Sequence, residues 1–129
     1  MKSKFIGANK LKLYSLYSRE DVGCKGTRIP GIKISENETV LFVNLGDKYD
    51  NRLTKKGLIH EPKAQKPIFS KPQTISCYLF LRSGNSGYYY VGVSNYQKKY
   101  NNNYNLLEFD TSGIPANIVK ALGGFQALP

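Results

Sequence analysis

The side chains best suited to chemistry lie in one stretch, LGDKYDNRLTKKGLIHEPK, at residues 45–63. His60 is the only histidine of the chain, so a Ser-His-Asp arrangement would have to use it, and His60 with Asp50 is a candidate general acid–base pair. Tyr49 and Asp47 add a flat ring and a second carboxylate. An ordinary loop is the alternative, because Asp and Asn favour turns for backbone reasons and a strand histidine can bond to a backbone carbonyl.

The rest of the chain offers little for catalysis. It has no G-x-S-x-G, no G-x-x-x-x-G-K-[ST] and no H-E-x-x-H. Cys24 and Cys77 are far apart, and with one histidine they cannot supply the four ligands of a structural zinc site. We therefore predict no metal, no cofactor and no enzymatic activity of the domain itself. The two cysteines are interpreted as reduced thiols, with a single disulfide as the alternative.

The charge balance favours a polyanionic partner. The chain has 19 Lys and Arg residues against 9 Asp and Glu, a formal net charge of +10. Its 10 tyrosines and 6 phenylalanines are interleaved with lysine and asparagine. Aromatic rings stack on bases and lysines neutralise phosphates, which favours nucleic acid. The alternative is a basic surface without such a partner, with the tyrosines packed in half-buried strands.

Neither a transmembrane run nor a secretory h-region is present in the sequence, so we expect a cytoplasmic protein with no membrane partner. Alternating or apolar runs between turn residues predict strands at 10–18, 31–35, 39–45, 57–61, 74–83, 87–96 and 106–110. Ser18 and Asp21 fit a capping box before a short helical turn. Pro115 and Gly123 bracket a C-terminal helix at about 115–122.

The spacing of these strands predicts a mainly β fold, a curved antiparallel β-barrel with one or two short helices. We expect one domain over residues 1–129, cut from a larger protein.

Four segments in their order resemble the SRA-like modification-reader domains of the PUA-like superfamily. They are LYSREDVG, GTRIPGIKIS, TVLFVNLGDKYDNRLTKKGLIHE and YLFLRSGNSGYYYVGV, followed by a closing P…LGG. The resemblance covers residues 14–124. It departs at HEPKAQKP, where His60 stands in the place of a tyrosine and prolines and lysines replace glycines.

The resemblance implies a PUA/SRA-like barrel that extrudes one base of double-stranded DNA, most consistently a modified cytosine. Tyr49 and His60 would stack on the base, and Asp50, or Asp47 in its place, would accept a hydrogen bond from its amino group. Basic side chains would contact the DNA backbone. The candidates are Lys48, Arg52, Lys55, Lys56, Lys63, Lys66, Arg28 and Lys98.

As a function, the resemblance implies a DNA-binding specificity domain that targets a covalently linked nuclease, helicase or AAA+ translocase in a restriction system of phage defence. Three alternatives stay open. They are a PUA-like RNA-binding protein or N6-methyladenine reader, a small acid–base enzyme using His60 and Asp50, and a protein-interaction domain with an incidental basic surface.

Overall fold

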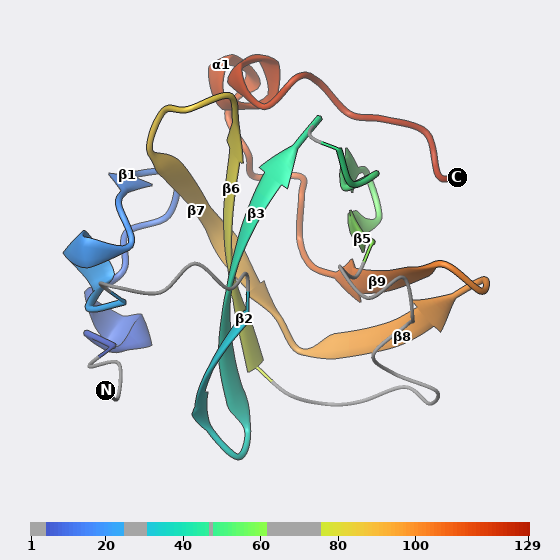
Figure 1. The fold of residues 1–129 in the computed structure, drawn as a ribbon. Helices are drawn as coiled ribbons and strands as arrows, with labels where there is room; N and C mark the ends of the chain where they lie inside the picture. Colours follow the sequence, from blue (N-terminus) through green and yellow to red (C-terminus); the bar gives the residue numbers. More distant parts are fainter. Residues whose placement is uncertain (1–4, 25–30, 47, 62–75) are drawn as a thin grey trace.

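A computed structural model describes residues 5–24, 31–46, 48–61 and 76–129. Within these ranges nine strands form two sheets. The first sheet has the order β1-β7-β6-β3-β2 and the second the order β4-β5-β9-β8 (Figure 1). The first contains β1 (Leu16–Tyr17), β2 (Gly31–Ser35), β3 (Glu38–Leu45), β6 (Ser76–Ser83) and β7 (Tyr88–Ser94). The second contains β4 (Arg52–Thr54), β5 (Gly57–His60), β8 (Tyr96–Tyr100) and β9 (Tyr104–Glu108).

Helical structure is sparse, as the sequence predicted. The helix α1 spans Ala116–Ala121, and two 3-10 turns, η1 and η2, span Ala8–Lys10 and Glu20–Val22. Pro115 directly precedes α1, and Gly123 after it has φ 90°, the left-handed conformation that favours glycine. No described helix is long and apolar enough to cross a membrane. The mainly β class is therefore confirmed.

In the described part of the chain the strand pairs are antiparallel, as predicted, except for the pair of β3 with β6, which is parallel. The strands β3 and β6 run side by side in register from Glu38 opposite Ser76 to Leu45 opposite Ser83. Parallel strands need a long connection between them, and the polar segment after β3, which includes the β4–β5 hairpin, provides it. As a result, β3 and β6 end at the same edge of the sheet, close to α1 (Figure 1).

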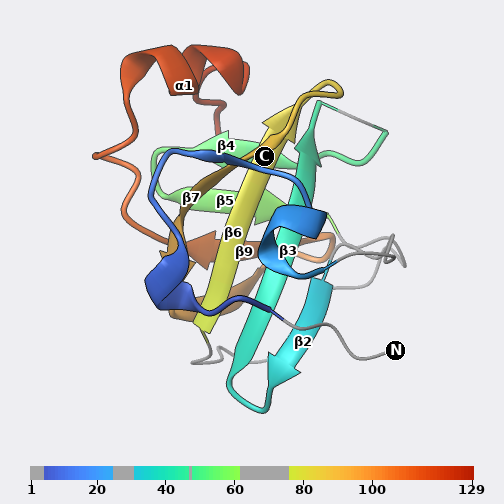
Figure 2. The same cartoon turned by 90° about the vertical axis from the view of Figure 1, so that its left-hand side faces the viewer.

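The first sheet is covered on both faces. One face packs against the second sheet and α1, and the N-terminal segment lies over the other face (Figure 2). The residues of β3 alternate between the two cores, with Val40 and Phe42 in one and Leu41, Val43 and Leu45 in the other. The apolar sequence of this strand predicted such a central position, because a strand buried on both faces has no polar side.

Two other segments differ from the predictions. The predicted strand at 10–18 is reduced to β1, because Tyr14 has φ 65° and this left-handed conformation interrupts an extended strand. The polar segment after Tyr96, predicted as a loop, forms β8 instead. Only Asn95 separates β7 from β8, so this nearly continuous strand carries the chain from the first sheet into the second.

Candidate functional site

The carboxylate of Asp50 is the centre of a polar network. Nε and Nη2 of Arg52 donate to Oδ1 and Oδ2 of Asp50 at 2.7 and 3.0 Å, and the Tyr104 hydroxyl donates to Oδ2 at 2.7 Å. The backbone N–H of Asp50 donates to Oε1 of Glu61 at 2.9 Å. The hydrogen bonds from Arg52, followed by the one from Tyr104, lower the pKa of Asp50. The carboxylate is therefore ionised near neutral pH and fixed in orientation.

This network forms one wall of a cleft of about 500 Å³, called the Asp50 cleft below. Asp50, Asn51 and Arg52 supply the polar wall, and the buried side chains of Leu45, Leu53 and Leu122 supply apolar surface. The volume of the cleft falls in the range of roughly 300–1,000 Å³ that is usual for small-molecule sites, but its lining is more polar than theirs. The stretch that the sequence singled out therefore does line a cleft.

The predicted stacking residues do not line the Asp50 cleft. Tyr49 is half-buried, and Nζ of Lys48 lies 5.2 Å from the centroid of its ring. His60 is buried and lies on the same face of β5 as Leu58, which belongs to the core between the two sheets. No aromatic ring of the described residues lines this cleft. Asp47, the substitute carboxylate, lies outside the described residues.

His60 belongs to a second polar group, on the inner face of the second sheet. It lies opposite Asn105 in the β5–β9 pair, and Gln97 lies opposite Leu107 in the β8–β9 pair. These residues share the face of Leu58 and Leu107, which belong to the core between the sheets. We call His60, Asn105 and Gln97 the inner-face cluster; their exposed fractions are 8%, 1% and 2%.

The inner-face cluster has polar atoms without partners. Among the described residues, Nδ2 and Oδ1 of Asn105 and Nε2 of Gln97 make no hydrogen bond. Burial lowers the pKa of His60 from 6.5 to about 4, so the imidazole is neutral at pH 7. The described contacts of Asp50 are with Arg52, Tyr104 and Glu61. The acid–base pair of Asp50 with His60 is not among them.

The residues predicted to contact the DNA backbone have different surroundings in the structure. Lys48, Lys55 and Lys56 are exposed. Arg52 is engaged by Asp50 and also donates from Nη1 to the backbone oxygen of Ala127 at 3.0 Å. Lys98 forms an ion pair with Glu108 at 3.2 Å. Arg28, Lys63 and Lys66 lie outside the described residues.

A second cleft, called the Arg82 cleft below, was missed by sequence reasoning. Its volume is about 520 Å³, and Arg19, Arg82 and Tyr88 are among its lining residues. Arg19 lies within the predicted reciprocal cap of Ser18 with Asp21, which is present, with Asp21 N donating to Ser18 Oγ at 3.0 Å. The sequence did contain one indication of this cleft. Arg82 and Tyr88 flank the turn of the predicted β6–β7 hairpin, which brings them close together.

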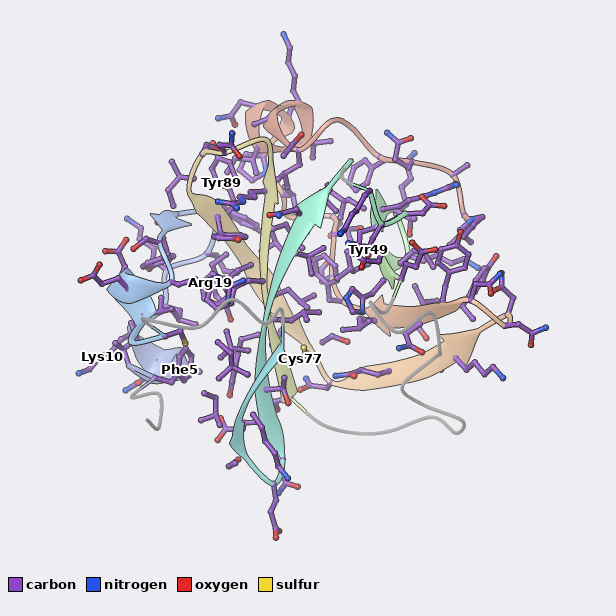
Figure 3. All side chains as sticks on the ribbon, viewed as in Figure 1. Phe5, Lys10, Arg19, Tyr49, Cys77 and Tyr89 are labelled. Carbon is purple, nitrogen blue, oxygen red and sulfur yellow. The ribbon has the colours of Figure 1, made fainter. Side chains whose placement is uncertain are left out.

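Figure 3 shows Arg19 and Tyr49 on either side of β3. Among the described residues, no three His, Cys, Asp or Glu side chains are grouped to hold a metal ion.

No model of a protein family matches this chain, and neither the curated proteins nor the solved structures include a match to it.

Proposed function

We propose that this chain is a DNA-binding specificity domain that receives an extruded, modified base and directs a linked nuclease or translocase to modified DNA. The observation that carries the proposal is the Asp50 cleft, where a fixed, ionised carboxylate stands beside apolar surface. The net charge of +10 supports a polyanionic ligand. The most suitable base is a modified cytosine.

The carboxylate retains capacity for a ligand. Each carboxylate oxygen can accept about two hydrogen bonds. Oδ1 of Asp50 accepts one from Arg52, whereas Oδ2 accepts one from Arg52 and one from Tyr104. Among the described residues no second donor reaches Oδ1, so this oxygen has acceptor capacity that would suit the exocyclic amino group of cytosine. Because Arg52 and Tyr104 already fix the carboxylate, little ordering is needed when a base arrives.

The apolar surface of the cleft suits a methyl substituent. Leu45, Leu53 and Leu122 are buried side chains on its lining. One added carbon in an apolar pocket typically changes affinity by about 10- to 200-fold. A preference for 5-methylcytosine over cytosine in this range is therefore expected. Exposed Lys48, Lys55 and Lys56 add a sequence-independent attraction that weakens as salt increases.

Fluorescence polarisation with matched duplexes at near-physiological salt tests this proposal. The duplexes carry cytosine, 5-methylcytosine, 5-hydroxymethylcytosine or N6-methyladenine at one position. We expect the wild-type protein to prefer a modified cytosine and Asp50→Asn to lose the preference. Asp110→Asn is the matched control, because Asp110 is an exposed carboxylate whose described bonds are to Ser112.

A further variant distinguishes the contribution of the Asp50 carboxylate to binding from that of the hydrogen bonds that hold it. Tyr104→Phe removes one hydrogen bond to Asp50 but leaves the carboxylate and Arg52 in place. We expect it to retain the preference. Equal binding of the wild-type protein to all four duplexes overturns the proposed function. A preference for N6-methyladenine instead replaces the cytosine assignment with the alternative reader.

A further inference from the structure

The guanidinium of Arg82 is held in place at the wall of the Arg82 cleft. Its Nε donates to Oδ1 of Asn44 at 2.6 Å, and its Nη1 donates to the backbone oxygen of Ser86 at 3.3 Å. Its central carbon lies 4.3 Å from the centroid of the Tyr88 ring. Among the described residues, Nη2 has no hydrogen-bond partner. A guanidinium fixed on an aromatic ring keeps its edge donors available for a planar or tetrahedral anion.

A second guanidinium lies near the same ring. The central carbon of Arg19 is 4.5 Å from the centroid of Phe42 and 5.9 Å from that of Tyr88. Both arginines line the cleft, together with one carboxylate, Glu20. An anion bound in a cleft lined by two cations is attracted by both. The local charge of the lining is therefore suited to a phosphate group.

A third, smaller hollow of about 170 Å³ shares lining residues with both clefts. It shares Leu45 and Gly46 with the Asp50 cleft and Asn85 with the Arg82 cleft. Gly46 and Gly84, which also line it, have φ 73° and 78°, and a Cβ added at either would meet nothing within 4 Å. The three hollows therefore have neighbouring positions at the end of the sheet where β3 and β6 end.

We infer that the Arg82 cleft binds a phosphate of the same nucleic-acid strand whose base enters the Asp50 cleft. The strand crosses the edge over Gly46 and Gly84, and Arg82 and Arg19 hold a backbone phosphate beside the extruded nucleotide. This inference rests on the proposed function. It adds a fixed anchor for the nucleic-acid backbone. This anchor defines the path of the nucleic-acid strand relative to the Asp50 cleft.

Arg82→Gln tests the anchor, with Lys33→Gln as the matched control for one lost charge. Lys33 is exposed on β2 and lines none of the three hollows. Duplexes with and without the preferred modification are titrated at several salt concentrations. We expect Arg82→Gln to lower the affinity for both duplexes by the same factor and to reduce the salt slope of log affinity by about one. The ratio between the duplexes should not change.

Ser86→Glu provides an independent variant, because it adds a carboxylate to the wall of the cleft while leaving both arginines. Its side chain is exposed, so the fold should tolerate the change. We expect the same uniform loss of affinity. Thermal unfolding of all variants identifies any that fail to fold, and the Nε–H NMR signal of Arg82 in the wild-type protein reports contact with an added oligonucleotide directly.

The outcomes separate this inference from the proposed function. If the duplex preference is intact but Arg82→Gln and Ser86→Glu behave like Lys33→Gln, the phosphate assignment is overturned and the proposed function stands. If Arg82→Gln abolishes the preference, the cleft reads the base and not the backbone, which also overturns the assignment. If pyrophosphate shifts the Arg82 signal and DNA does not, the cleft is a free-anion site. Absence of any preference in the wild-type protein instead removes the proposed function.

Discussion

The Asp50 cleft and the inner-face cluster both contain polar groups, but these groups differ in their hydrogen bonding and in their exposure to water. The Asp50 carboxylate has three donors from two side chains and lies where water can reach it. Asn105 is 1% exposed, and neither atom of its amide has a partner among the described residues. Paired polar groups stabilise a fold modestly, whereas an unpaired buried group costs about 1–3 kcal/mol. The hydrogen bonds of Asp50 should therefore raise the free energy of unfolding, and the unpaired amide of Asn105 should lower it.

Acidification should give the largest contrast between the two regions. The pKa of His60 is lowered by burial from 6.5 to about 4, so between these values the unfolded chain binds more protons than the folded one. The unfolding free energy is therefore highest above pH 6.5, and it decreases by an amount on the order of 3 kcal/mol as the pH falls towards 4. The lowered pKa of Asp50 acts only below its usual value of 3.8.

Urea unfolding of the wild-type protein and His60→Asn at pH 7, 5.5 and 4 measures this effect. We expect the wild-type protein to lose stability more steeply than the variant over this range, because the variant cannot titrate there. Parallel pH dependences of the two proteins would contradict the placement of a neutral, buried imidazole in the inner-face cluster.

Removing the Asp50 carboxylate should have the next largest effect. Asp50→Ala leaves the donors of Arg52 and Tyr104 without their acceptor. The side chains of Arg52 and Asp50 are 30% and 38% exposed, so water replaces part of the loss, and we expect a decrease in unfolding free energy of about 1–2 kcal/mol. Chemical denaturation at pH 7 measures it, with Tyr104→Phe expected to lose less. An unchanged midpoint for Asp50→Ala would show that the network contributes nothing to stability.

The smallest effect should have the opposite sign. Asn105→Leu replaces an amide without described partners by an apolar group of similar size, next to a core that contains Leu58 and Leu107. We expect a neutral change or a gain of up to about 1 kcal/mol in unfolding free energy. Asn102→Leu, at an exposed position, serves as the control and should change little. A clear loss of stability in Asn105→Leu would mean that the amide has a stabilising partner.

Local patterns predicted much of the fold. The apolar sequence of β3, the cap of Ser18 with Asp21, and the bracketing of α1 by Pro115 and Gly123 each depend on residues close in sequence. The parallel pairing of β3 with β6 could not be predicted in this way, because both pairing directions bury the same apolar residues. Likewise, β8 carries Gln97 and Lys98, whose types indicate a loop until the partner strand β9 is known.

The same distinction between local and long-range information applies to the candidate site. Asp50 was predicted from its own stretch, and it does line a cleft. Its hydrogen bond from Tyr104 joins residues 54 positions apart, which no local pattern reports. His60 was predicted as a stacking residue, but strand alternation on β5 directs it to the inside with Leu58. Arg82 was missed because a single arginine at the end of a strand has many structural uses.

The connection from Arg52 to the backbone of Ala127 spans 75 positions of the chain, and the backbone N–H of Gln126 donates to the oxygen of Leu53 at 2.7 Å. The parallel pairing of β3 with β6 is also non-local. Contacts of this kind form only after large loops have closed, which slows folding. During refolding the Asp50 cleft should therefore be completed in a late step, after the β6–β7 hairpin, and the duplex binding that we propose should appear only after this step.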